Sequence, residues 1–184
     1  MSAVKVVPFC VTLPPILSPD PSLGVVGTVT LRGGSAVVWF GWGAVEPSDG
    51  ADDGHSAAAA AAGCGRPAMG PLALSMPPAV RGGGRRDAAA PTTQLVAGPG
   101  EEDMILSQQI LSRISRRTDW PVFVSCSVAG RSGGMGEGGL ESPAAAAGMD
   151  DSLPGHAAAL AEREVSRIIL GEKKSALESN TKSC

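Results

Sequence analysis

The sequence is poor in aromatic residues and histidine, and it contains no long apolar run. No uninterrupted apolar stretch reaches the roughly 18 residues that a membrane-spanning helix requires. The segment from Val4 to Ile16 is broken by one lysine and several prolines, which does not fit a secretory signal peptide. We therefore expect no membrane partner. The expected location is the cytoplasm, and the nucleus is a second alternative.

Cysteine pairs and a positive net charge are also absent. None of the cysteines forms a Cys-x-x-Cys pair, and wide spacing of this kind argues against both a disulfide framework and a zinc site. The formal net charge of −3 and the pI of about 5.4 argue against a nucleic-acid-binding protein. We expect neither a metal nor a cofactor. The four cysteines are Cys10, Cys64, Cys126 and Cys184.

The sequence offers few candidates for a catalytic group. Ser125 and Cys126 lie on a predicted strand and are possible nucleophiles, but a nucleophile needs a positioned base. Neither His55 nor His156 lies within a recognisable catalytic motif. The glycines of 134–139 match a dinucleotide fingerprint by spacing, yet more glycines follow instead of the helix that the fingerprint needs. The sequence therefore favours a binding protein, with a small hydrolase that uses Ser125 or Cys126 as the alternative.

The clearest structural pattern lies between residues 91 and 128. Residues 92–97 are β-prone. An amphipathic helix then begins with acidic residues at Glu101 and ends with basic residues at Arg117. Pro121 disfavours helix for the residue before it and so ends that helix. Apolar residues at every second position of 122–128 predict a strand with one buried face.

The other patterns complete an α+β fold. Residues 24–31 and 36–43 predict a β-hairpin, 69–76 contains a short strand, and 156–172 has the apolar stripe of a second helix. We expect a small, mainly antiparallel sheet of about five to six strands with two amphipathic helices packed on it. The predicted organisation is a single domain over 24–172, with a proline-rich segment 1–23, glycine- and alanine-rich insertions near 46–68, 79–90 and 129–155, and a polar tail 173–184.

One tight aromatic cluster, formed by Trp39, Phe40 and Trp42, lies on the second strand of the predicted hairpin. Core packing is its first interpretation. Because side chains alternate along a strand, Trp39 points opposite to Phe40 and Trp42, and two helices can cover only one of those faces. The other face would then need a partner. The candidate partner-binding residues are this cluster and Arg113, Arg116 and Arg117, for which a solvated helix end is the alternative.

Four blocks in this order resemble the proteasome assembly chaperone 4 family. They are AVVWFGWG at 36–43, MGPLALSMP at 69–77, TTQLVAG with LSQQILSRISRRTDWPVFVSCSV within 92–128, and ALAEREVSRII at 159–169. The resemblance implies a non-enzymatic chaperone of the proteasome core particle. Its implied partners are a proteasome assembly chaperone 3-like subunit, as the other half of a heterodimer, and the α-type subunits whose ring it helps to form. The alternative is a generic heterodimerising adaptor with other clients.

Overall fold

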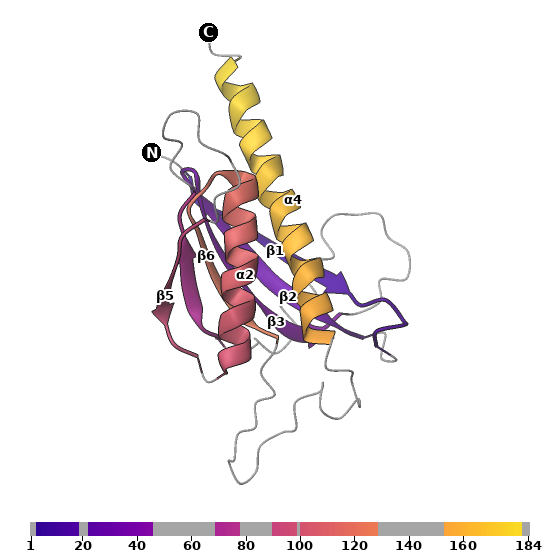
Figure 1. Cartoon of the computed structure of the whole chain (residues 1–184). Coiled ribbons are helices and arrows are strands. Elements are labelled where there is room, and N and C mark those ends of the chain that lie inside the picture. Colours follow the sequence, from indigo (N-terminus) through magenta and orange to yellow (C-terminus); the bar gives the residue numbers. More distant parts are fainter. Residues whose placement is uncertain are drawn as a thin grey trace.

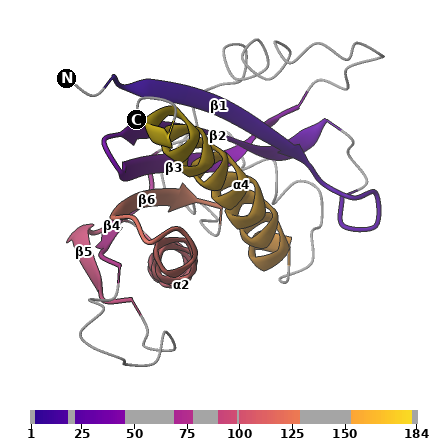
Figure 2. The ribbon, with the colours of Figure 1, turned by 90° about the horizontal axis from the view of Figure 1, so that it is seen from above.

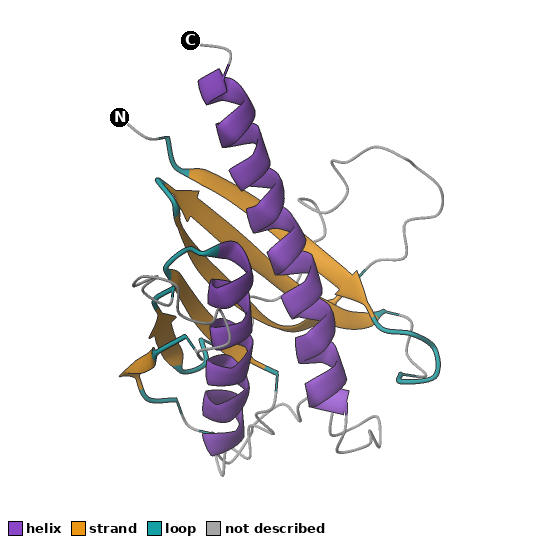
Figure 3. Ribbon diagram, turned by 45° about the horizontal axis from the view of Figure 1, so that its top comes forward, coloured by secondary structure: helices purple, strands orange, loops and turns teal. Residues whose placement is uncertain are grey.

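The computed structural model describes residues 3–18, 22–45, 69–77, 90–98, 100–128 and 153–181. These ranges form one sheet with two helices laid on it, so the predicted α+β class is confirmed (Figures 1 and 3). The elements are β1 (Lys5–Thr12), β2 (Leu23–Arg32), β3 (Ser35–Ala44), β4 (Leu72–Ser75), β5 (Thr92–Val96), α2 (Glu101–Thr118), β6 (Val122–Ser127) and α4 (Leu153–Thr181).

The sheet has six strands in the order β1-β2-β3-β6-β4-β5. Neighbouring strands are antiparallel except for β3 and β6, which are parallel, so the sheet is mainly antiparallel as predicted. Both helices lie on the same side of the sheet, α4 over β1 to β3 and α2 beside β6, β4 and β5 (Figure 2). We call this side the helix face and the opposite side the open face.

The predicted hairpin is formed by β2 and β3, each one residue longer at both ends than expected. Gly33 and Gly34 make its turn with positive φ angles of 51° and 84°, a conformation that glycine adopts without steric cost. The Ser35 hydroxyl donates a hydrogen bond of 2.7 Å to the Arg32 carbonyl across the same turn. Local turn chemistry therefore fixes the register of the two longest strands.

β1 is a strand that the sequence did not predict, because prolines punctuate the first 23 residues. It pairs antiparallel with β2 along its whole length, with Pro8 inside it. A proline is tolerated there because β1 is an edge strand, and one side of an edge strand has no ladder to break. Phe9, next to Pro8, is buried. Burial of this aromatic side chain favours the pairing of β1 with β2, although the proline weakens the local strand pattern.

The core lies between the helix face and the two helices. Phe9, Gly27 and Phe40 are register partners across β1, β2 and β3, and the two phenylalanine rings lie 6.5 Å apart between centroids. Gly27 makes room for them, since a Cβ there would overlap the Phe40 side chain. The predicted alternation along β6 is confirmed. The fully buried core also includes Val25, Val29, Val38, Val122, Val124, Cys126, Ile110, Leu111, Ile114, Ala157, Ala161, Val165 and Ile169.

The last helix is longer than its apolar stripe predicted. α4 begins at Leu153 and continues to Thr181, so much of the predicted polar tail is helical. The residues after Gly171 include good helix formers such as lysine, alanine and glutamate, and no proline interrupts them. Neither described helix is long and apolar enough to cross a membrane. The predicted insertions near 46–68, 79–90 and 129–155 lie outside the described residues, apart from Ala90 and the start of α4.

Candidate partner-binding face

Two rows of side chains run across all six strands on the open face. They lie on this face because their neighbours along the strands, such as Val38, Ala73 and Val124, are buried under the helices. Each row is a chain of register partners from one edge of the sheet to the other. The first row is Val6, Thr30, Val37, Phe123, Leu74 and Thr93, and the second is Pro8, Thr28, Trp39, Ser125, Leu72 and Val96.

The open face carries apolar side chains that remain in contact with solvent. Val6 is 60% exposed and Val37 is 45% exposed, whereas Val38, next to Val37 in the chain, is fully buried. Phe123 and Leu74 are half-buried in the same row. Exposed apolar side chains that gather on one face of a sheet are a feature of protein–protein interaction sites. The open face is therefore the candidate site.

Trp39 is the member of the aromatic cluster that lies on the open face, which confirms the predicted opposition to Phe40 and Trp42. Phe40 is fully buried in the core. On the helix face, Trp42 Nε1 donates a hydrogen bond of 2.7 Å to the Val128 carbonyl. Trp39 Nε1 is also buried, but it has no hydrogen-bond partner among the described residues.

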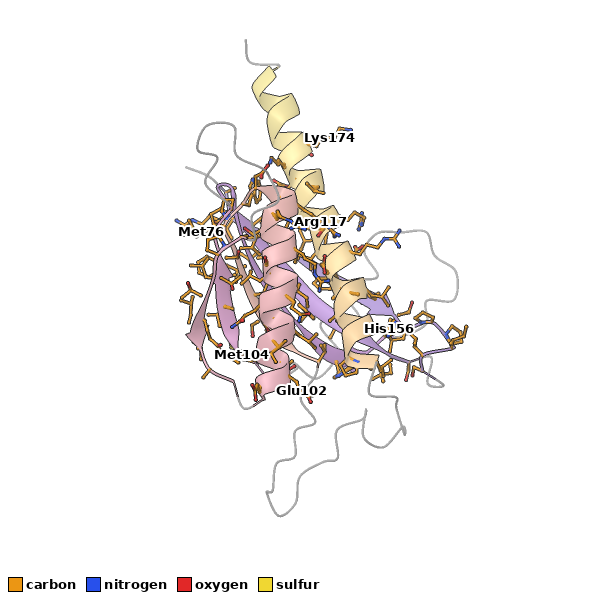
Figure 4. The ribbon with its side chains drawn as sticks, viewed as in Figure 1. Met76, Glu102, Met104, Arg117, His156 and Lys174 are labelled. Carbon is orange, nitrogen blue, oxygen red and sulfur yellow. The ribbon has the colours of Figure 1, made fainter. Side chains whose placement is uncertain are left out.

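Two of the three candidate arginines connect the helices to each other. Arg113 Nε and Arg117 NH1 each lie 3.0 Å from a carboxylate oxygen of Glu162 on α4, and the Glu162 side chain is only 6% exposed. Arg117 lies on the side of α2 that is next to α4 (Figure 4). Arg116 is exposed and forms no ion pair with a residue that the structure describes. Arg116 is therefore the arginine of this group that remains available to a partner.

Glu162 lies off the apolar stripe of 156–172, a position that predicts exposure to solvent, and this prediction is wrong. α2 lies against that flank of α4 and buries the carboxylate between two guanidinium groups. One local signal was present, because Arg113 and Arg117 are four residues apart and so share one side of a helix. No local pattern indicates which helix that side of α2 meets.

Both candidate nucleophiles are buried residues of β6. Ser125 is buried, and its hydroxyl donates a hydrogen bond of 3.1 Å to the Gly70 carbonyl. Burial raises the pKa of the Cys126 thiol to about 12, so almost none of it is thiolate at neutral pH. His156 is exposed on α4, and His55 lies outside the described residues. Within the described ranges, no group of three or more histidine, cysteine or acidic residues could hold a metal ion.

The raised thiol pKa predicts slow alkylation of Cys126. In the folded protein at pH 8, we expect iodoacetamide to modify Cys126 about 1000-fold more slowly than in the urea-unfolded chain, since thiolate fraction falls tenfold per pKa unit. Mass spectrometry of labelled peptides measures both rates, with the half-buried Cys10 as the internal reference. Native labelling of Cys126 as fast as Cys10 would contradict the buried, protonated thiol.

The chain is similar in fold to a known structure, whereas its sequence matches no protein-family model and no curated protein. Among solved structures, the chain is similar to one from the structure titled "Crystal Structure of a Novel Chaperone Complex for Yeast 20S Proteasome Assembly". The two share 11% sequence identity with a TM-score of 0.47, over 94% of this chain and 96% of the other. At these values the similarity carries no inference about function.

Proposed function

We propose that this chain is a non-enzymatic chaperone for assembly of the proteasome core particle, and that it acts as one half of a heterodimer. The observation that carries the proposal is the apolar open face, which no described helix covers. The four sequence blocks that resemble proteasome assembly chaperone 4 support it. They fall on β3, on β4, on the segment from β5 through α2 to β6, and on α4. The related chaperone would cover the open face, and α-type subunits would be the clients.

The dimensions of the open face suit a single partner of similar size. Six strands at about 4.8 Å spacing make a face about 24 Å wide, and ten residues at about 3.3 Å span about 33 Å. The face is thus no larger than about 800 Å², which is the area that each partner contributes to a standard interface. One second sheet packed on the open face would bury Val37, Trp39 and Phe123 together.

Purification from the native cell followed by mass spectrometry tests the proposed clients. We expect a second small chaperone and α-type proteasome subunits to copurify with the tagged chain. Recovery of a second small subunit with unrelated clients would favour the generic adaptor. Recovery of neither the second small chaperone nor α-type subunits would contradict the proposed function.

Val37→Glu tests the interface itself. A carboxylate at this position of the open face would be buried without a counter-charge in the complex, so we expect affinity for the partner to fall at least about tenfold. Leu170→Glu is the matched control, because Leu170 is 42% exposed against 45% for Val37 and lies on α4. Titration calorimetry measures the affinities, and circular dichroism checks that both variants are folded. Equal loss of binding in the two variants would contradict an interface on the open face.

A further inference from the structure

The two edges of the sheet are unlike in their protection against further strand pairing. β1 contains Lys5 and Pro8, two residue types that natural proteins place on edges to block an incoming strand. Lys5 is also held by Glu172 of α4, at 2.7 Å between Nζ and the carboxylate. β5 reads Thr-Thr-Gln-Leu-Val, with no charge and no proline between Thr92 and Val96. The β5 edge therefore lacks the residues that protect the β1 edge.

Exposed apolar side chains gather beside β5. Met76, Leu95, Val96 and Ile105 are each between 44% and 54% exposed, and we call them the β5 margin. The Met76 amide donates to the Pro91 carbonyl at 3.2 Å, which places Met76 beside the start of β5. Gln108 of α2 contacts Gln94 of β5 at 3.5 Å, which places this flank of α2, one turn from Ile105, beside β5. The β5 margin thus comes from β5 itself, the end of β4 and the start of α2.

The backbone of β5 pairs on one side only. Its partner is β4, and no described strand pairs with the other side. Outward N–H and C=O groups on an unprotected edge are a template for another strand. The register is irregular between Leu72 and Ala73, which leaves Leu95 without a cross-strand partner and with an exposed side chain.

We propose that the outer edge of β5 binds an extended segment of another protein as a seventh strand. The segment has hydrophobic side chains at alternate positions, which would pack on the β5 margin while the backbone bonds provide affinity. Because β5 has five residues, the edge fits a short linear segment and not a whole sheet. Glu101 and Glu102 are exposed in the first turn of α2, shortly after the Val96 end of β5 in the chain, and Figure 4 shows Glu102 there. A basic residue at that end of the segment complements them.

This edge shares Val96 with the second row of the open face and is otherwise separate from it, since a strand added in the plane of the sheet leaves both faces as they are. The chain could then hold its dimer partner and an extended segment at the same time. The inference rests on β5 and its surroundings, and it stands whether or not the proposed chaperone function holds.

The test uses the full chain and an end-blocked, fluorescein-labelled peptide of sequence Lys-Thr-Val-Thr-Val-Thr-Val-Ser. We expect saturable binding, with amide hydrogen exchange slowed at residues 92–96 and unchanged at 5–12. Leu95→Lys should weaken peptide binding at least about tenfold, because a charge on the edge opposes strand pairing. Val4→Lys is the matched control, as Val4 is also exposed and precedes the other edge strand. Val37→Glu, on the open face, should leave peptide binding unchanged.

Three results would overturn the proposal. They are absence of saturable binding at millimolar peptide, slowed exchange at β1 instead of β5, and loss of peptide binding in Val37→Glu. If the free chain formed dimers with slowed exchange at 92–96, a second copy would be the occupant of the edge, and the assignment to another protein would be wrong. Failure to find a chaperone partner would alter none of these measurements.

Discussion

Replacing Phe40 with alanine is expected to lower the free energy of unfolding by about 3–5 kcal/mol. Phe40 is fully buried, and its ring packs against Phe9 at 6.5 Å between centroids above Gly27. Because Gly27 has no side chain to fill the gap, truncation leaves a cavity in the middle of the core in addition to the lost apolar burial. Urea denaturation followed by circular dichroism measures the difference.

Trp39→Ala is the control for this prediction, since Trp39 is adjacent to Phe40 in β3 but lies on the open face. Trp39 is half-buried, and its indole N–H has no hydrogen-bond partner among the described residues. We expect its loss to destabilise the isolated chain less than Phe40→Ala by at least about 1 kcal/mol, and to weaken partner binding instead. A larger loss of stability from Trp39→Ala than from Phe40→Ala would contradict the assignment of the two faces.

Removing both arginines that bind Glu162 is expected to cost about 3–5 kcal/mol of unfolding free energy. In Arg113→Met/Arg117→Met the uncharged side chains still cover Glu162, so its carboxylate would stay buried between α2 and α4 without a counter-charge. Each arginine alone should cost less than half of this, because the remaining guanidinium still binds one carboxylate oxygen. Thermal and urea unfolding of the three variants measure the coupling between the two ion pairs.

Glu162→Gln removes the same two ion pairs by neutralising their shared carboxylate. The two arginine side chains are about half exposed, so water can hydrate them when the carboxylate is gone. We expect this change to cost less than about 2 kcal/mol, well below the double arginine variant. Equal costs would show that Glu162 is not the buried member of the cluster.

The elements that the sequence predicted correctly are those defined by local pattern. Alternation along 122–128 gave the buried face of β6, the glycines at 33 and 34 gave the hairpin turn, and Pro121 gave the end of α2. β1 was missed because the prolines that weaken its local signal are harmless on an edge, and only the order of strands shows that β1 is an edge.

The candidate site was predictable only in part, for the same reason. Alternation along β3 placed Trp39 apart from Phe40 and Trp42, since that relation depends on neighbouring residues alone. The rows on the open face join strands that are distant in the chain, such as β1 and β5, and no local pattern gives their register. Likewise, the burial of Glu162 follows from the placement of α4 against α2, which are separated by β6 and residues 129–152.

The position of α4 has a consequence for synthesis of the protein. α4 is made after the other described elements, yet it lies over β1, β2 and β3, which precede it in the chain, and Glu172 of α4 binds Lys5 of β1. While the ribosome is still translating residues before 153, the buried sides of Phe9, Val25 and Phe40 have no cover. We therefore expect the nascent chain to complete its fold only after α4 has left the exit tunnel.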